Sequence, residues 1–146
     1  MSMIERARVV SIVFSMSALF CASSFAQSPA GDPDRQKAKL VSRLYQATYG
    51  SVERCKHATP AAAGEFQTEL TRFVKQNASL MKLIVDSPHY ARAREQFARH
   101  ETVDPTRDTP ENLAGECQFL AGLLRSMLDT PDGRQSAKEW QETLSK

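Results

Sequence analysis

The sequence predicts an all-α protein: a small up-down bundle of four to five helices with one disulfide. After residue 26, apolar residues recur at spacings of three and four, which is the period of an amphipathic helix. Five Asp-Pro, Ser-Pro or Thr-Pro pairs supply helix caps followed by a first-turn proline. The pairs are Asp32-Pro33, Thr59-Pro60, Ser87-Pro88, Thr109-Pro110 and Thr130-Pro131. β-branched residues are sparse and no segment alternates at period two, so no strand is predicted.

Residues 1–26 have the pattern of a cleavable secretory signal peptide. An uncharged apolar run over residues 9–20 follows a basic start, and Ser24 and Ala26 supply the small residues before a cut. The run is shorter than the ~20 residues that span a bilayer, which disfavours an uncleaved anchor. A lipid anchor at Cys21 is disfavoured by the bulky Phe20 before it. We therefore expect a periplasmic or secreted protein without stable membrane insertion.

Cleavage would leave a flexible lead at residues 27–32 and a single helical domain at residues 33–146. The net charge would fall from +2 to +1, because Arg6, Arg8 and Glu5 leave with the signal. A nearly neutral domain has no overall electrostatic reason to bind nucleic acid or an anionic membrane.

Cys55 and Cys117 are the two cysteines that remain after residue 26. An even pair in an oxidising compartment predicts one Cys55–Cys117 disulfide, closing a loop of roughly 60 residues. The alternative is a pair of free thiols or one reactive cysteine, which lacks a Cys-x-x-Cys motif and a well-spaced histidine. In an up-down bundle the first and fourth helices are neighbours, which allows this bridge.

The helices follow the proline pairs in order. The segment after Thr59 is either one helix to residue 85 or two helices that break near Asn77. The expected spans are about 33–56, 60–85, 88–100, 110–129 and a last amphipathic helix that follows Thr130-Pro131 or starts a turn later. The phenylalanines expected in the core are Phe66, Phe73, Phe97 and Phe119.

No catalytic residue, metal ligand or cofactor is predicted. The three histidines, His57, His89 and His100, have neither His-x-x-x-His spacing nor a Cys-x-x-Cys partner. Glu65 and Glu69 lie four apart, as exposed helical charges often do. There is no nucleophile elbow, phosphate loop, dinucleotide fingerprint or haem motif. An enzyme is therefore the less favoured class, although active sites also assemble from residues far apart in sequence.

A basic cluster with interleaved aromatics surrounds the third helix and could hold an acidic protein surface or an anionic glycan. The alternative is a solvated helix face with aromatic core anchors. The candidate partner-binding residues are Tyr90, Arg92, Arg94 and Arg99, flanked by His89 and His100. A second basic run near the start of the domain, with the same two interpretations, is Arg35, Lys37, Lys39 and Arg43.

The favoured function is an exported protein that binds another protein, for example as an inhibitor or immunity-type factor. The alternative is a small-molecule or metal carrier with a pocket inside the bundle, lined by Phe66, Phe73 or Leu120. Periplasmic acid-stress chaperones and bacterial immunity proteins include small exported helical domains with one disulfide. This chain shares that broad plan without matching a motif of either group, so the sequence assigns no family.

Overall fold

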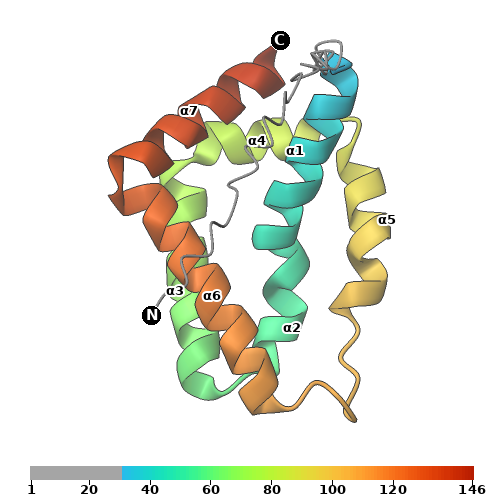
Figure 1. The fold of residues 1–146 in the computed structure, drawn as a ribbon, viewed down its shortest axis with the longest axis vertical. Helices are drawn as coiled ribbons and strands as arrows, with labels where there is room; N and C mark the ends of the chain where they lie inside the picture. The colour runs from blue at the N-terminus through green and yellow to red at the C-terminus, as the bar shows by residue number, and fades with distance from the viewer. Residues whose placement is uncertain (1–30) are drawn as a thin grey trace, which may run out of the picture. The chain divides into compact units, whose positions relative to one another are not determined.

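The computed structural model describes residues 31–146, whose regular secondary structure is entirely helical (Figure 1). The all-α prediction is confirmed, but the count of four to five helices is wrong for this range, because two predicted helices are each divided. The predicted signal peptide and residues 27–30 of the lead lie outside the described residues. The seven α-helices and one short 3₁₀ helix of residues 31–146 are α1 (Pro33–Ala47), η1 (Tyr49–Ser51), α2 (Val52–Lys56), α3 (Pro60–Gln76), α4 (Ala78–Asp86), α5 (Tyr90–Glu101), α6 (Pro110–Asp129) and α7 (Pro131–Ser145).

The first division falls at Thr48, inside the helix expected over residues 33–56. The Thr48 hydroxyl donates to the Leu44 carbonyl at 2.6 Å, and the Ser51 hydroxyl donates to the Gln46 carbonyl at 2.6 Å. These hydroxyl groups therefore donate to carbonyls that would accept backbone N–H groups in a continuous helix. Gly50 lies against the Tyr45 ring, where an added Cβ would be 2.8 Å from Cε1. This close approach leaves no room for a Cβ at position 50 unless the Tyr45 ring shifts.

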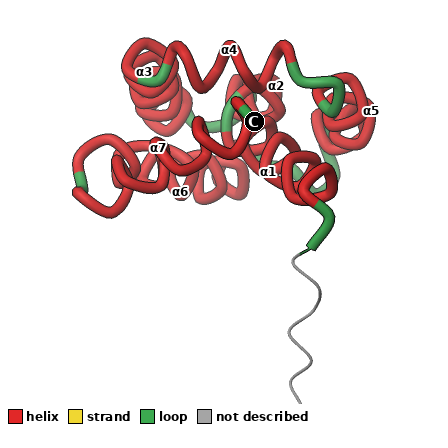
Figure 2. Tube along the Cα trace, turned by 90° about the horizontal axis from the view of Figure 1, so that it is seen from above, coloured by secondary structure: helices red, strands yellow, loops and turns green. Residues whose placement is uncertain are grey.

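The second division falls at Asn77, one of the two alternatives for residues 60–85. Asn77 has φ −114° and ψ 36°, outside the helical region, and its side-chain amide donates to the Phe73 carbonyl at 3.2 Å. α4 therefore leaves in a new direction and crosses the end of the bundle from α3 to α5 (Figures 1 and 2). A regular up-down bundle would have no such transverse helix.

Four of the five proline pairs begin a helix at the proline. The side chains of Asp32, Thr109 and Thr130 accept backbone N–H bonds at 3.0, 3.2 and 3.0 Å, as helix caps do. Thr59 precedes Pro60 without a side-chain cap bond. After Ser87-Pro88 the chain makes a turn, with the Ser87 hydroxyl accepting the His89 N–H at 3.2 Å, and α5 begins at Tyr90.

The long helices form two parallel pairs. In the α1–α5 pair, Asp34 contacts His89 near both starts and Tyr45 contacts Glu101 near both ends. In the α3–α6 pair, which has the most extensive contact between elements, Glu65 contacts Arg125 and Arg72 contacts Asp129. α1 packs mainly on α5, so the expected neighbours, the first and fourth predicted helices, meet mainly through α2.

The predicted disulfide is present, and it joins α2 to α6. The Cα atoms of Cys55 and Cys117 are 5.7 Å apart, and both residues are buried. Phe66 and Phe73 lie in the core as predicted, and Phe97 is half-buried against it. The prediction for Phe119 is wrong, because its side chain is 71% exposed. Phe119 lies two residues, or about 200° around the helix, from the buried Cys117.

Candidate functional site

The two basic clusters of the sequence meet along one side of the seam between α1 and α5. A hollow of about 430 Å³ there is lined by Arg35, Lys39 and Arg43 from α1 and by Arg92 from α5. His89, just before α5, also reaches it, and no acidic residue lines it. We call the surface formed by Arg35, Lys39, Arg43, Arg92 and Arg99 the basic groove.

Helical spacing places these side chains in two rows. Arg35, Lys39 and Arg43 repeat every four residues and so share one face of α1. Arg92 and Arg99 are seven residues apart and share one face of α5. A neighbouring hollow of about 380 Å³ is lined by Gln46, on the next turn of α1, and by Arg99, and also by Asp108 and Glu116, the two carboxylates that Arg54 contacts. The five cations therefore extend along α1 from Arg35 to about the level of Gln46, about 16 Å at 1.5 Å per residue.

The five cations of the basic groove are all exposed, and none pairs with a carboxylate of residues 31–146. Like charges four apart on a helix repel and weaken it by a few tenths of a kcal/mol per pair. The row on α1 contains two such pairs, Arg35 with Lys39 and Lys39 with Arg43. No ion pair among residues 31–146 offsets this repulsion.

The structure separates the four residues predicted to bind a partner. Arg92 and Arg99 lie in the groove, whereas Arg94 is about 200° around α5 from Arg92 and lines neither hollow. Tyr90 is half-buried, with its ring edge-on to Tyr45 and the ring centroids 5.5 Å apart. The three cations of α1 join the two arginines of α5, a set that neither cluster alone predicts.

Aromatic packing holds α1 and α5 together behind the groove. Tyr45 is almost fully buried, and its ring centroid is 6.1 Å from that of Phe97. The Tyr45 hydroxyl donates to Glu101 at 2.7 Å. Burial, and after it the Glu101 carboxylate, raise the pKa of Tyr45 far above its usual value, so the hydroxyl keeps its proton.

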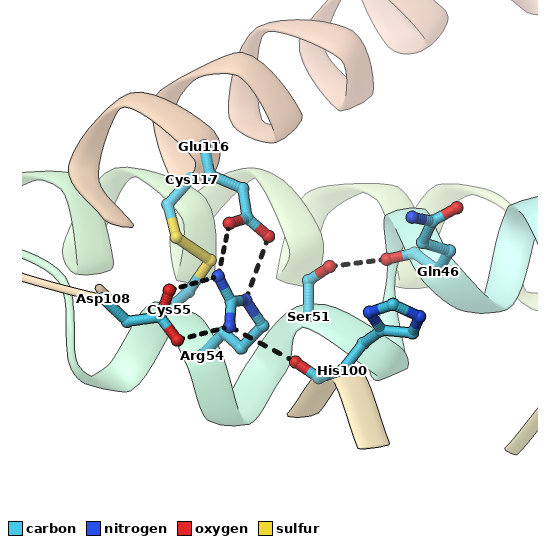
Figure 3. Close-up of a disulfide and its surroundings, with 8 residues drawn as sticks. All are labelled: Gln46, Ser51, Arg54, Cys55, His100, Asp108, Glu116 and Cys117. Atoms are coloured by element: carbon cyan, nitrogen blue, oxygen red, sulfur yellow. Dashed lines mark hydrogen bonds and ion pairs between the residues drawn. A yellow bond between two sulfur atoms is a disulfide. The ribbon is translucent and has the colours of Figure 1, made fainter. Parts of the chain in front are cut away.

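Arg54 lies beside the disulfide and ties four segments together (Figure 3). Its guanidinium donates to both Asp108 oxygens at 3.0 and 3.2 Å, to Glu116 at 2.9 and 3.2 Å, and to the His100 carbonyl at 3.4 Å. The side-chain hydrogen bond from Arg54 is the main cause that lowers the pKa of Asp108. Arg54 therefore fixes the loop between α5 and α6 against α2. Sequence reasoning missed this residue, although opposite charges immediately precede the two bonded cysteines.

Arginine and carboxylate side chains along the contact between α3 and α6 also form ion pairs. Arg125 donates to Glu65 at 2.7 Å and to Glu69 at 3.0 Å, and Arg72 donates to Glu69 at 2.7 Å and to Asp129 at 2.9 Å. These carboxylates raise the pKa of both arginines. Glu65 and Glu69, four apart on one helix, are therefore partners in an ion-pair network.

The residues predicted to line a pocket inside the bundle, Phe66, Phe73 and Leu120, pack mostly within the hydrophobic core. Phe66 borders a hollow of about 280 Å³ with Val52, Lys56 and Gln67. Phe73 is fully buried and Leu120 is 9% exposed within the core cluster. Residues 31–146 contain no group of three or more side chains that could hold a metal ion. In the same range, no helix has the length and apolarity needed to span a membrane.

Comparisons with protein-family models, with curated proteins and with solved structures found no match to this chain.

Proposed function

We propose that this chain is an exported protein that acts by binding another protein, and that the basic groove is its contact surface. One observation carries the proposal: five exposed cations on facing sides of α1 and α5 lack a carboxylate partner among residues 31–146. The other basic side chains that bridge helices, Arg54, Arg72 and Arg125, have such partners.

A concentrated charge on a rigid surface suits protein recognition. Complementary charge steers a partner toward its site and disfavours wrong partners. Four of the five groove cations are arginines, the basic residue that protein interfaces favour. Because the groove is built on packed helices, binding would cost little backbone ordering. The expected partner is therefore a protein with an acidic surface.

The sequence supports export to the periplasm or out of the cell. Residues 1–26 have the three-part pattern of a signal peptide, and the remaining cysteines form a pair. Disulfides form and persist in oxidising compartments. An inhibitor or immunity-type factor, which acts by occupying a partner, is one concrete form of this function.

The test compares two charge-reversed variants of equal net charge. The exported chain is purified with its disulfide intact, and mass spectrometry should place its first residue at Gln27. The groove variant carries Lys39→Glu and Arg92→Glu, and the control carries Lys75→Glu and Lys138→Glu on α3 and α7. Each is immobilised, exposed to envelope extract of the producing cells, and the retained proteins are identified.

A protein retained by the wild type and the control, and lost from the groove variant, is then purified and titrated by calorimetry. A complex of defined stoichiometry that requires the groove supports the proposal. If the groove and control variants retain the same proteins as the wild type, the basic groove is not the binding surface.

A small-molecule carrier is the second candidate, favoured by one hollow. This hollow, about 750 Å³, lies beside the loop between α5 and α6 and is lined in part by Val103, Pro105 and His57. Its volume falls in the range of small-molecule sites. A ligand bound there should raise the melting temperature. A screen of small envelope metabolites by thermal shift tests this, with Val103→Asp as the blocked variant.

A further inference from the structure

We infer that the basic groove binds an extended acidic segment, about five residues long, whose carboxylates alternate between the α1 and α5 rows. The inference rests on the proposed function, because it names the part of the partner that enters the groove. Three features of the groove carry it: its floor, the spacing of its cations and its length.

The floor of the groove is narrow and made of small side chains. Ala38 and Ser42 of α1 are half-buried, and Ala93 of α5 is 3% exposed. The long cationic side chains stand on both sides of this floor. Packed helices have axes 8–10 Å apart, and a helix with its side chains is about 10–12 Å across. A docked helix would therefore be too wide to enter between the two rows of cations and would contact only the ends of their side chains. An extended chain is narrow enough to contact the floor.

The spacing of the cations on α1 matches that of an extended chain. Arg35, Lys39 and Arg43 repeat at about 6 Å along α1. In a strand, residues i and i+2 point to the same side and are about 6.6 Å apart. Consecutive acidic residues would send alternate carboxylates to α1 and to α5. Arg92 and Arg99 are about 10 Å apart along α5, and their long side chains span the difference from the strand repeat. The groove length of about 16 Å corresponds to about five residues at 3.3 Å each.

The floor also favours a peptide over other polyanions. An extended backbone carries N–H and C=O groups that require hydrogen-bond partners. The Ser42 hydroxyl lines the hollow, and so does the exposed Gln96 amide, which lies on α5 between Arg92 and Arg99. A sulfated glycan or a polyphosphate presents anionic groups but no such regular series of amide donors. An acidic peptide is therefore the ligand that uses both the rows and the floor.

The experiment uses the disulfide-bonded protein and two synthetic peptides with equal length, charge and composition. The first has five consecutive glutamates flanked by two serines on each side. The second alternates five glutamates with four serines, so that an extended chain directs every carboxylate to one side. Titration calorimetry in low salt should show about tenfold tighter binding of the first peptide, equivalent to two or three exposed ion pairs.

Variants of the two rows sharpen the test. Arg92→Ser should weaken the first peptide severalfold and leave the second, which can bind along α1, nearly unchanged. Lys138→Ser on α7 is the control of equal charge and should affect neither peptide. Circular dichroism confirms that both variants remain folded, as expected for exposed positions.

Equal affinity for the two peptides would overturn the inference, since binding would then follow charge alone. Tighter binding of a heparin hexasaccharide or of inorganic polyphosphate, lost in Arg92→Ser, would also overturn it. If a protein requires the groove but the first peptide does not compete with it, the proposed function stands and the extended segment is wrong. If neither requires the groove, both proposals fail.

Discussion

The two parallel helix pairs of this protein differ in whether their basic side chains form ion pairs. Between α3 and α6, the arginines at positions 72 and 125 each contact two carboxylates. Along the groove between α1 and α5, five cations have no carboxylate partner among residues 31–146. Residues 27–146 are nearly neutral overall, so this contrast reflects the distribution of charge.

This difference in pairing distinguishes side chains that stabilise the fold from side chains that are free to contact a partner. The disulfide and Arg54 fasten α2 to α6, on the side where charges are paired. The groove cations are exposed and their removal breaks no ion pair within the described domain. Substitutions on the paired side should therefore change stability, whereas those in the groove should change binding.

The largest effect on stability is expected from the disulfide, the strongest link on the paired side. It spans 62 residues, for which the chain-entropy relation gives about 4 kcal/mol. The double substitution Cys55→Ala and Cys117→Ala should lower the melting temperature by roughly 15 °C for a domain of this size. Circular dichroism melts with and without reductant measure this. Melting of the wild type that is insensitive to reductant would contradict the role given to the bond.

Arg54 should have the next largest effect, because three segments depend on its guanidinium. Its side chain is 17% exposed, and Arg54→Met keeps the aliphatic stem while removing the guanidinium that donates to Asp108, Glu116 and the His100 carbonyl. We expect a loss of about 2 kcal/mol in urea denaturation. The control Arg107→Met removes an exposed pair with Asp104 and should cost at most about 0.5 kcal/mol. Equal losses would show that Arg54 is an ordinary surface arginine.

A smaller effect, with a defined pH dependence, is expected at Asp108. Arg54 lowers its pKa in the folded state, so its contribution is present above the unfolded pKa of about 3.9. That contribution is lost as pH falls through the lower folded pKa. The free-energy difference between wild type and Asp108→Asn should hold from about pH 8 to 5 and shrink below about pH 4. Urea denaturation at both ends measures it, and a constant difference would refute the linkage.

The elements that depend on local chemistry could be predicted from the sequence. The helix expected over residues 110–129 is α6, and four of the proline pairs begin helices where expected. The breaks at Thr48 and Asn77 are harder to predict, because each depends on a side chain that bonds a carbonyl one turn earlier. The same residue types also occur within continuous helices.

The groove could be predicted only in part. Helical spacing alone places Arg92 with Arg99 and excludes Arg94 from their side of α5. That α1 supplies the other row depends on α4, which carries the chain across the bundle and delivers α5 beside α1. Such a crossing is set by tertiary packing, and no spacing within either helix encodes it.

The smallest expected effect on stability is in the groove itself. Lys39→Ser removes two like-charge contacts at a spacing of four residues, so stability should stay within about 0.5 kcal/mol or rise slightly. Added salt should stabilise the wild type more than this variant, because it screens the repulsion that the variant lacks. The comparison variant, Arg125→Ser, deprives the buried Glu69 of one of its two arginine partners and should lower stability more than Lys39→Ser does. Urea denaturation in low and high salt measures the free energy of unfolding of the two variants. An equal loss for Lys39→Ser and Arg125→Ser would mean that the groove cations stabilise the fold and are not reserved for binding.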